Sequence, residues 1–112
     1  MLTDKRKFPA YFLRLECGRE PARDWLETLG KDDRLIIDTE IEKLEFGEPL
    51  GLTYGRRIGG GLFELRSYLS GGRFARIFYA ISRRRLILIH GVTGSSRIPG
   101  EVRRFAKIGA RK

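Results

Sequence analysis

Residues 61–93 contain three short β-type segments, and the first two of them carry arginine side chains. Ser-Gly-Gly joins the first two segments and Ser-Arg-Arg-Arg joins the last two, so the stretch predicts a compact antiparallel meander. Arg66 and Arg76 lie within the first and second segments, and His90, the only histidine, lies near the end of the third. Because guanidinium groups bind phosphate through charge-assisted, often bidentate hydrogen bonds, the pattern indicates a phosphate-binding surface.

Further cations extend this candidate surface on both sides of the meander. They are Arg56 and Arg57 in a glycine-rich loop, Arg73 at a turn, Arg97 after the last strand, and Arg103 and Lys107 in the C-terminal tail. RNA cleavage needs little more, since the ribose 2′-OH attacks the adjacent phosphorus and the protein orients the backbone and stabilises the added negative charge. A base and an acid accelerate the two proton transfers. The sequence predicts no cofactor and no metal site.

Each strand arginine also has a structural interpretation. Arg66 alternates out of the core, so it either contacts phosphate or is an ordinary solvated strand residue. Arg76 shares a face with Phe74 and Phe78, where an uncompensated charge is expensive. It must therefore pair with a carboxylate such as Glu64, or face a ligand groove.

His90 and the turn at Arg83 to Arg85 can likewise be interpreted as structural or as functional. His90 is expected on the same face as Leu86 and Leu88, where a lone histidine is either a hydrogen-bonded structural residue or a catalytic or RNA-contacting group. The run Arg83 to Arg85 is expected to be a solvated hairpin turn.

The charge balance restricts the kind of partner. Lys and Arg total 23 against 14 Asp and Glu, which gives a net charge of +9 on 112 residues. Such a field on a small domain favours polyanions, chiefly nucleic acid, although an acidic protein or an anionic membrane surface would also fit. The length predicts one domain, spanning residues 1–112.

Several classes of protein and site are disfavoured by the sequence. Cys17 is the only cysteine, so an intramolecular disulfide and a cysteine-based metal site are excluded, and a reducing cytoplasm is expected. Cys17 itself is expected at a strand end or in the core. The N-terminal residues lack the apolar stretch of a signal peptide, and no apolar run approaches the ~20 residues of a membrane helix. Gly59 to Gly61 are not followed by a helix, which argues against a nucleotide-binding loop.

The elements that would position these residues follow from periodicity and turn residues. We expect a strand at 8–17, two helices at 19–30 and 31–47 forming a hairpin, a loop at 47–61, strands at 62–68, 73–81 and 86–92, and a short helix in the tail after residue 97. Within the helices, Gly30 is expected just after the first, Asp32 or Asp33 as the cap of the second, and Ile37, Ile41 and Leu44 as the inward stripe of the second. The segment 73–81 is largely apolar on both faces, which predicts a central strand, and Val102, Phe105 and Ala106 are expected to face inward in the tail helix. This order predicts an α+β domain with helices on one face of a mostly antiparallel sheet.

The phrases GLFELR, SGGRFARIFY and LILIHGV resemble the RelE/HigB/ParE superfamily of type II toxin–antitoxin toxins, in particular its phage-derived HigB-like branch. The resemblance covers residues 61–92, and the helix hairpin and the GEPLG segment at 47–51 also fit. It implies a RelE-like fold and, for RelE and HigB members, a metal-independent RNase that cuts mRNA, usually on the ribosome, and is neutralised by an antitoxin.

By this resemblance, Arg66 matches the arginine that contacts the scissile phosphate. Arg76 matches the arginine of the strand after the glycine turn, and His90-Gly91 matches a His-Gly pair at the end of the next strand. The chain departs from its relatives immediately afterwards, where Gly94 and Ser95 stand in place of two lysines.

The rest of the C-terminal region also differs from the pattern. Arg97 can stand in for a further lysine, and the tyrosine that other RelE members carry near the C-terminus is absent, with Phe105 the only aromatic residue there. The resemblance therefore implies a thinner supply of cations around the reacting phosphate than active relatives have.

Two functions are consistent with these observations. The first is an mRNA interferase toxin, with Arg66, Arg76 and Arg97 stabilising the phosphate and His90 transferring a proton. The second is a non-enzymatic protein of the same fold, either a ParE-like inhibitor of DNA gyrase or an inactive relative that binds antitoxin and operator. A generic basic RNA-binding module is a third reading. The expected partners are mRNA and a small helix-turn-helix antitoxin.

Overall fold

The computed structural model describes residues 6–47, 56–94, 100 and 102. The elements in chain order are β1 (Ala10–Phe12), α1 (Pro21–Glu27), α2 (Lys31–Phe46), β2 (Arg56–Gly59), β3 (Leu62–Tyr68), the 3-10 turn η1 (Ser70–Gly72), β4 (Phe74–Ser82) and β5 (Arg85–Thr93). The strands form one sheet in the order β1-β5-β4-β3-β2, in which β1 runs parallel to β5 and the other pairs are antiparallel. The predicted α+β class and the three-strand meander are confirmed.

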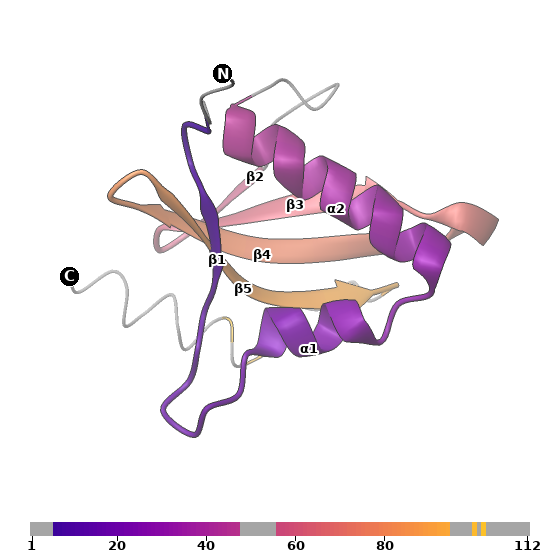
Figure 1. Ribbon diagram of the computed structural model, residues 1–112, viewed down its shortest axis with the longest axis horizontal. Helices are drawn as coiled ribbons and strands as arrows, with labels where there is room; N and C mark the ends of the chain where they lie inside the picture. Colours follow the sequence, from indigo (N-terminus) through magenta and orange to yellow (C-terminus); the bar gives the residue numbers. More distant parts are fainter. Residues whose placement is uncertain (1–5, 48–55, 95–99, 101, 103–112) are drawn as a thin grey trace, which may run out of the picture.

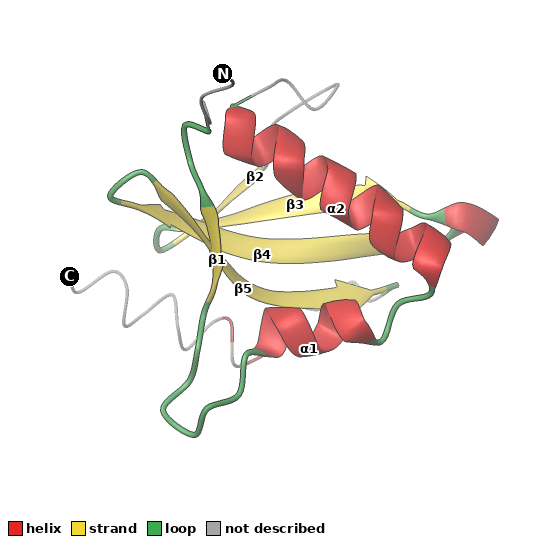
Figure 2. Ribbon diagram, viewed as in Figure 1, coloured by secondary structure: helices red, strands yellow, loops and turns green. Residues whose placement is uncertain are grey.

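Both described helices cover the same face of the sheet, with α1 beside β5 and α2 crossing the strands obliquely (Figure 1; Figure 2). Alternate apolar side chains of β3, β4 and β5 form one side of this core, and apolar side chains of the two helices form the other. The buried residues of this layer are Ala22, Leu26, Ile37, Ile41, Leu44, Leu65, Leu69, Ala75, Ile77, Tyr79, Leu86 and Leu88. The predicted inward stripe of the second helix is thereby confirmed. Neither helix in the described part of the chain is long and apolar enough to cross a membrane.

The helix ends differ from the sequence-based expectation in two details. Gly30 does not follow α1 as a left-handed residue; it has extended backbone (φ −67°, ψ 164°) and is the N-cap residue of α2. Asp33 does not cap α2, because its carboxylate binds Arg73 on the connection between β3 and β4. The end of α2 is as expected, since Gly47 has a left-handed φ of 70°, a conformation that glycine adopts without strain.

Two strand predictions were wrong. Only Ala10–Phe12 of the expected strand 8–17 pairs with the sheet, and Cys17 is exposed in the following turn rather than in the core. The expected loop at 47–61 contains β2, which pairs antiparallel with β3. Gly59, Gly60 and Gly61 all have positive φ, so these residues make the reversal between β2 and β3.

A β-bulge in β5 determines which face each of its last residues occupies. Tyr79 pairs with Leu88 and Phe78 pairs with His90, which leaves Ile89 as the extra residue. The expectation that His90 shares a face with Leu86 and Leu88 is therefore wrong, because the bulge moves His90 to the opposite face. Gly91 then points toward the helices.

Of the predicted C-terminal helix, Gly100 and Val102 lie within the described part of the chain, and both are helical. Val102 is buried against Leu62, Phe78 and Ile89 on the face of the sheet opposite to α1 and α2. The expected inward residues Phe105 and Ala106 lie outside the described residues.

We predict that Gly91→Ala destabilises the fold, because a Cβ at this position would lie 2.1 Å from Cε3 of Trp25. Overpacking of this kind lowers the free energy of unfolding by about 1–3 kcal/mol. Urea unfolding followed by circular dichroism measures the change. The matched control is Gly100→Ala, which meets no atom within 4 Å and, at a helical position, is expected to leave stability unchanged or to raise it by up to about 1 kcal/mol. Equal stability of both variants would contradict the assigned register of β5.

Candidate functional site

The face of the sheet turned away from α1 and α2, here called the outer face, gathers four of the six predicted site residues that the structure describes. Strand register places Arg56, Glu64, Phe78 and His90 in one row across four strands. The next row contains Arg66 and Arg76 on adjacent strands, followed by Val92. Residues directly opposite one another in a sheet share a face and lie close together.

Glu64 joins the two arginines of the second row. Its Oε2 accepts a hydrogen bond from Nη2 of Arg76, and its Oε1 lies 3.7 Å from Nη2 of Arg66. Arg66 and Arg76 are direct cross-strand neighbours, an arrangement in which like charges repel. The single carboxylate between them offsets that repulsion, and pairing with Glu64 is one of the two arrangements that the sequence left open for Arg76.

The two arginines differ in their access to solvent. Arg76 and Glu64 are 5% and 3% exposed, so their pair is buried in the sheet. The side chain of Arg66 is 46% exposed. Arg66 is therefore the member of the group that a ligand on the outer face can reach, whereas Arg76 is in contact mainly with protein.

Aromatic rings hold both guanidinium groups in place. The guanidinium carbon of Arg66 lies 4.9 Å from the centroid of the Phe74 ring, and that of Arg76 lies 5.2 Å from the Phe78 ring. Such cation–π contacts restrict the plane of the guanidinium group. Arg66 is thus fixed by Phe74 and by Glu64 while part of it remains in solvent.

His90 lies half-buried at the β5 end of the first row. Its Nδ1 is 2.8 Å from the backbone nitrogen of Gly91 and 2.9 Å from the Gly91 carbonyl oxygen. Where the Gly91 N–H donates to Nδ1, the neutral ring carries its proton on Nε2. The backbone thus occupies one ring nitrogen and orients the imidazole.

Two other predicted RNA-contacting arginines lie away from this group. Nη2 of Arg73 donates to Oδ2 of Asp33 at 2.7 Å, and its Nε donates to the Ser70 carbonyl oxygen at 3.1 Å. Arg73 therefore fastens the β3–β4 connection to the start of α2. Arg57 alternates to the helix side of β2, where its guanidinium carbon lies 5.8 Å from the centroid of the Phe63 ring.

The structure thus brings together Arg56, Arg66, Arg76 and His90 and separates them from Arg57 and Arg73. Arg97, Arg103 and Lys107 lie outside the described residues. Among the described residues, no group of three or more His, Cys, Asp or Glu side chains is placed to hold a metal ion.

Sequence reasoning missed one polar residue of the outer face. Tyr68 is 75% exposed and pairs with Phe74, so it lies on the same face as Glu64 and Arg66. The signal was present, because alternation along residues 62–68 places positions 64, 66 and 68 on one side. An exposed aromatic ring beside a cation suits the stacking of an unpaired base.

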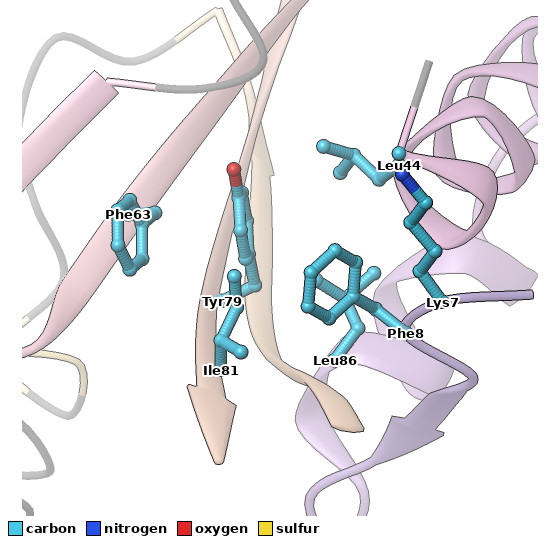
Figure 3. Close-up of a pocket in the computed structure, with 8 residues that line it drawn as sticks. Lys7, Phe8, Leu44, Phe63, Tyr79, Ile81 and Leu86 are labelled. Carbon is cyan, nitrogen blue, oxygen red and sulfur yellow. The ribbon is translucent and has the colours of Figure 1, made fainter. Parts of the chain in front are cut away.

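A separate pocket of about 320 Å³ opens on the helix side of the sheet (Figure 3). It is lined by Lys7, Phe8, Leu44, Gly47, Phe63, Tyr79, Ile81 and Leu86. Figure 3 shows Tyr79 between Phe63 on one side and Phe8 with Leu86 on the other. Burial raises the pKa of Tyr79 from 10.0 to about 12, so its phenol stays protonated at neutral pH. This mostly apolar pocket lacks the cationic grouping of the outer face.

Comparison of the chain with protein-family models, with curated proteins and with solved structures finds no match.

We predict that Glu64→Gln lowers the free energy of unfolding by about 3–5 kcal/mol, because it leaves the buried charge of Arg76 uncompensated. Urea unfolding measures the loss. The double variant Glu64→Met with Arg76→Met is expected to regain much of it, since an apolar pair of similar volume replaces both charges.

The control for this experiment is Asp38→Asn, which breaks the solvent-exposed ion pair with Arg34 (3.2 Å) on α2. That variant is expected to change stability by no more than about 1 kcal/mol. If Glu64→Gln proves as mild as Asp38→Asn, Glu64 does not have the central role assigned to it here.

Proposed function

We propose that this protein is the toxin of a type II toxin–antitoxin module and acts as a metal-independent endoribonuclease that cuts mRNA on the ribosome. One observation carries the proposal: Arg66 is partly exposed, held in place by Glu64 and Phe74, and shares the outer face with the only histidine. The resemblance of residues 61–92 to the RelE/HigB/ParE superfamily supports the same activity.

The chemistry proposed for this face is transesterification at one phosphate. The ribose 2′-oxygen forms a bond to phosphorus and loses its proton to a base, while the bond to the 5′-oxygen breaks and that oxygen gains a proton. Arg66 donates hydrogen bonds to the non-bridging oxygens, which carry more negative charge in the transition state than in the substrate. Nε2 of His90 accepts or delivers one of the two protons.

The spacing of the two residues suits a single phosphodiester and its ribose. Arg66 is on β3 and His90 is on β5, two strands and one row apart, which corresponds to about 12 Å between backbones. A guanidinium group and an imidazole ring extending from such positions can approach opposite sides of one phosphate. Arg56, beside Glu64 on β2, is placed to contact the next phosphate along the RNA.

In this proposal Arg76 is a positioning residue. Its guanidinium group is buried against Glu64, and Glu64 in turn lies beside the Arg66 guanidinium. Arg76 therefore acts through Glu64 rather than by touching RNA. The contacts predicted for Arg97, Arg103 and Lys107 remain predictions, as do a helix-turn-helix antitoxin partner and a cytoplasmic location.

A specific observation also favours the second candidate, a non-enzymatic ParE-like inhibitor of DNA gyrase or an inactive binding protein of the same fold. Glu64 cancels one of the two arginine charges, leaving 2 − 1 = +1 on the Arg66, Arg76 and Glu64 group. That supply of positive charge is small for a phosphoryl-transfer site. A DNA gyrase supercoiling assay separates the two candidates, since an interferase leaves supercoiling unchanged.

We predict that Arg66→Ala lowers the rate of mRNA cleavage by about 100- to 1000-fold, the usual effect of removing one donor to a developing oxyanion. Primer extension on mRNA incubated with purified ribosomes measures the cleavage. Arg34→Ala removes the same charge from the exposed surface of α2 and is the matched control, with an expected rate close to that of the wild type. Cleavage that survives Arg66→Ala, in a protein folded by circular dichroism, removes the basis of the proposed activity.

We also predict that His90→Gln lowers the cleavage rate by about 10²- to 10⁴-fold, because it removes the proton-transferring nitrogen. The same primer-extension assay measures the rate, and thermal unfolding shows whether the variant keeps wild-type stability. An unchanged rate would mean that His90 only orders the backbone near Gly91.

A further inference from the structure

A second group of cations surrounds a hollow at the other end of the sheet. The hollow measures about 690 Å³ and is lined by Arg6, Lys7, Phe8, Pro9, Tyr11, Arg83, Arg84 and Arg85. It forms where the chain leading into β1 lies beside the β4–β5 hairpin, as Figure 1 shows at the left of the view. The backbone nitrogen of Leu86 donates to the Pro9 carbonyl oxygen at 3.0 Å and holds these two segments together.

The lining of the hollow is strongly positive. It contains four arginines and one lysine and no acidic side chain. Among the lining residues, Arg6 pairs with Glu45 at 3.3 Å and lies over the Phe46 ring. Arg83, Arg84 and Arg85 are exposed at the tip of the hairpin, so their charges face solvent. A concave surface lined by one sign of charge concentrates the field on a ligand of the opposite sign.

The hairpin turn is built from residues that do not favour its geometry. Ser82 pairs with Arg85, which leaves Arg83 and Arg84 as a two-residue turn with φ of 51° and 63°. A turn with two positive φ values favours Asn-Gly, because most side chains are strained there. Two arginines at these positions place charge at the rim of the hollow at the expense of local stability.

Tyr11, the exposed aromatic residue of the hollow, lies on the outer face. Tyr11 pairs with Ile87, which pairs with Ala80 on the side of the sheet that carries Phe78 and Arg76. Its ring is 51% exposed, and the guanidinium carbon of Arg85 lies 5.5 Å from the ring centroid. An exposed ring braced by arginine is a platform on which an unpaired base can stack.

We propose that this hollow is a second RNA-binding site, which takes the sugar-phosphate backbone of a single strand and stacks one base on Tyr11. The proposal goes beyond the cleavage assigned to Arg66, because binding here needs no reaction. The lining combines cations with an exposed aromatic ring, and single-stranded RNA offers both a phosphate backbone and a base that stacks, whereas an acidic protein offers only the charge, so RNA fits better. The hollow lies about 20 Å along β4 from Arg76, and Val102 packs on the outer face between them, against Phe78, so the hollow is separate from the first site.

The test uses the variant Arg83→Asn with Arg84→Gly, which removes two charges and installs the residues that the turn favours. The probe is a fluorescein-labelled 12-nucleotide 2′-O-methyl oligouridine, whose blocked 2′-oxygen prevents cleavage. Fluorescence anisotropy at several salt concentrations measures affinity. We expect the variant to melt at a higher temperature than the wild type, to bind the probe more weakly, and to show a salt slope reduced by about 1.4, from two lost phosphate contacts.

The matched control is Arg34→Gln with Lys43→Gln, which removes two exposed charges from α2. If this control weakens binding as much as the turn variant does, net charge alone explains the affinity and the proposed site is wrong. Displacement of the probe by polyglutamate as efficient as by unlabelled oligouridine would also overturn it, in favour of an acidic protein partner.

A second variant tests the stacking contribution of the aromatic platform. Tyr11→Ala is expected to weaken probe binding at least about 5-fold without changing the salt slope. Unchanged affinity would remove the base-stacking part of the proposal. Because none of these measurements involves cleavage, they remain interpretable even if Arg66→Ala leaves mRNA cleavage intact.

Discussion

The outer face depends on one buried carboxylate. Arg66 and Arg76 are cross-strand neighbours on β3 and β4, and without Glu64 their charges would repel within the sheet. Burying Glu64 and Arg76 is itself unfavourable unless each satisfies the other, so the three side chains are interdependent. The contacts of Glu64 that offset the repulsion between the two arginines also hold the Arg66 guanidinium group in place at the solvent-exposed side. The stability of the sheet and the exposure of the Arg66 charge to a ligand thus both depend on the Glu64 carboxylate.

The β-bulge at Ile89 has a comparable influence on the other half of the site. It places His90 on the outer face and turns the next residue, Gly91, toward the indole of Trp25. The indole Nε1 also donates to Oγ1 of Thr93 at 3.2 Å, so α1 is fastened to the end of β5. A single extra residue therefore decides both the position of the imidazole and the close approach of helix to sheet.

Much of this architecture follows from periodicity in the sequence. The stripe of Ile37, Ile41 and Leu44 predicted the buried side of α2, and the apolar residues on both faces of 73–81 predicted a central strand. The position of β2 was not predictable, because its glycine-rich sequence indicates a loop and its pairing depends on a partner strand. The role of Asp33 was also not predictable from nearby residues. Its position suggests a helix cap, but its carboxylate instead binds Arg73, which is 40 residues away in the sequence.

For the site, the sequence indicated residue types better than their placement. Arg66 and the pairing of Arg76 with Glu64 were predictable, because alternation and the cost of a buried charge restrict the options. The face occupied by His90 was not predictable, because a bulge breaks the two-residue period on which such an inference depends.

The pairing of β1 with β5 has a consequence for how the chain reaches its native state. Ala10 lies opposite Leu86, a separation of 86 − 10 = 76 residues, so this edge of the sheet closes a loop that includes both helices and three strands. Such long-range closure is entropically costly and slows folding relative to local contacts. During synthesis, β1 cannot pair with the sheet until β5 has left the ribosome. His90 is part of β5, so it joins the outer face at the same stage. The nascent chain therefore completes the outer face only after β5 has been synthesised.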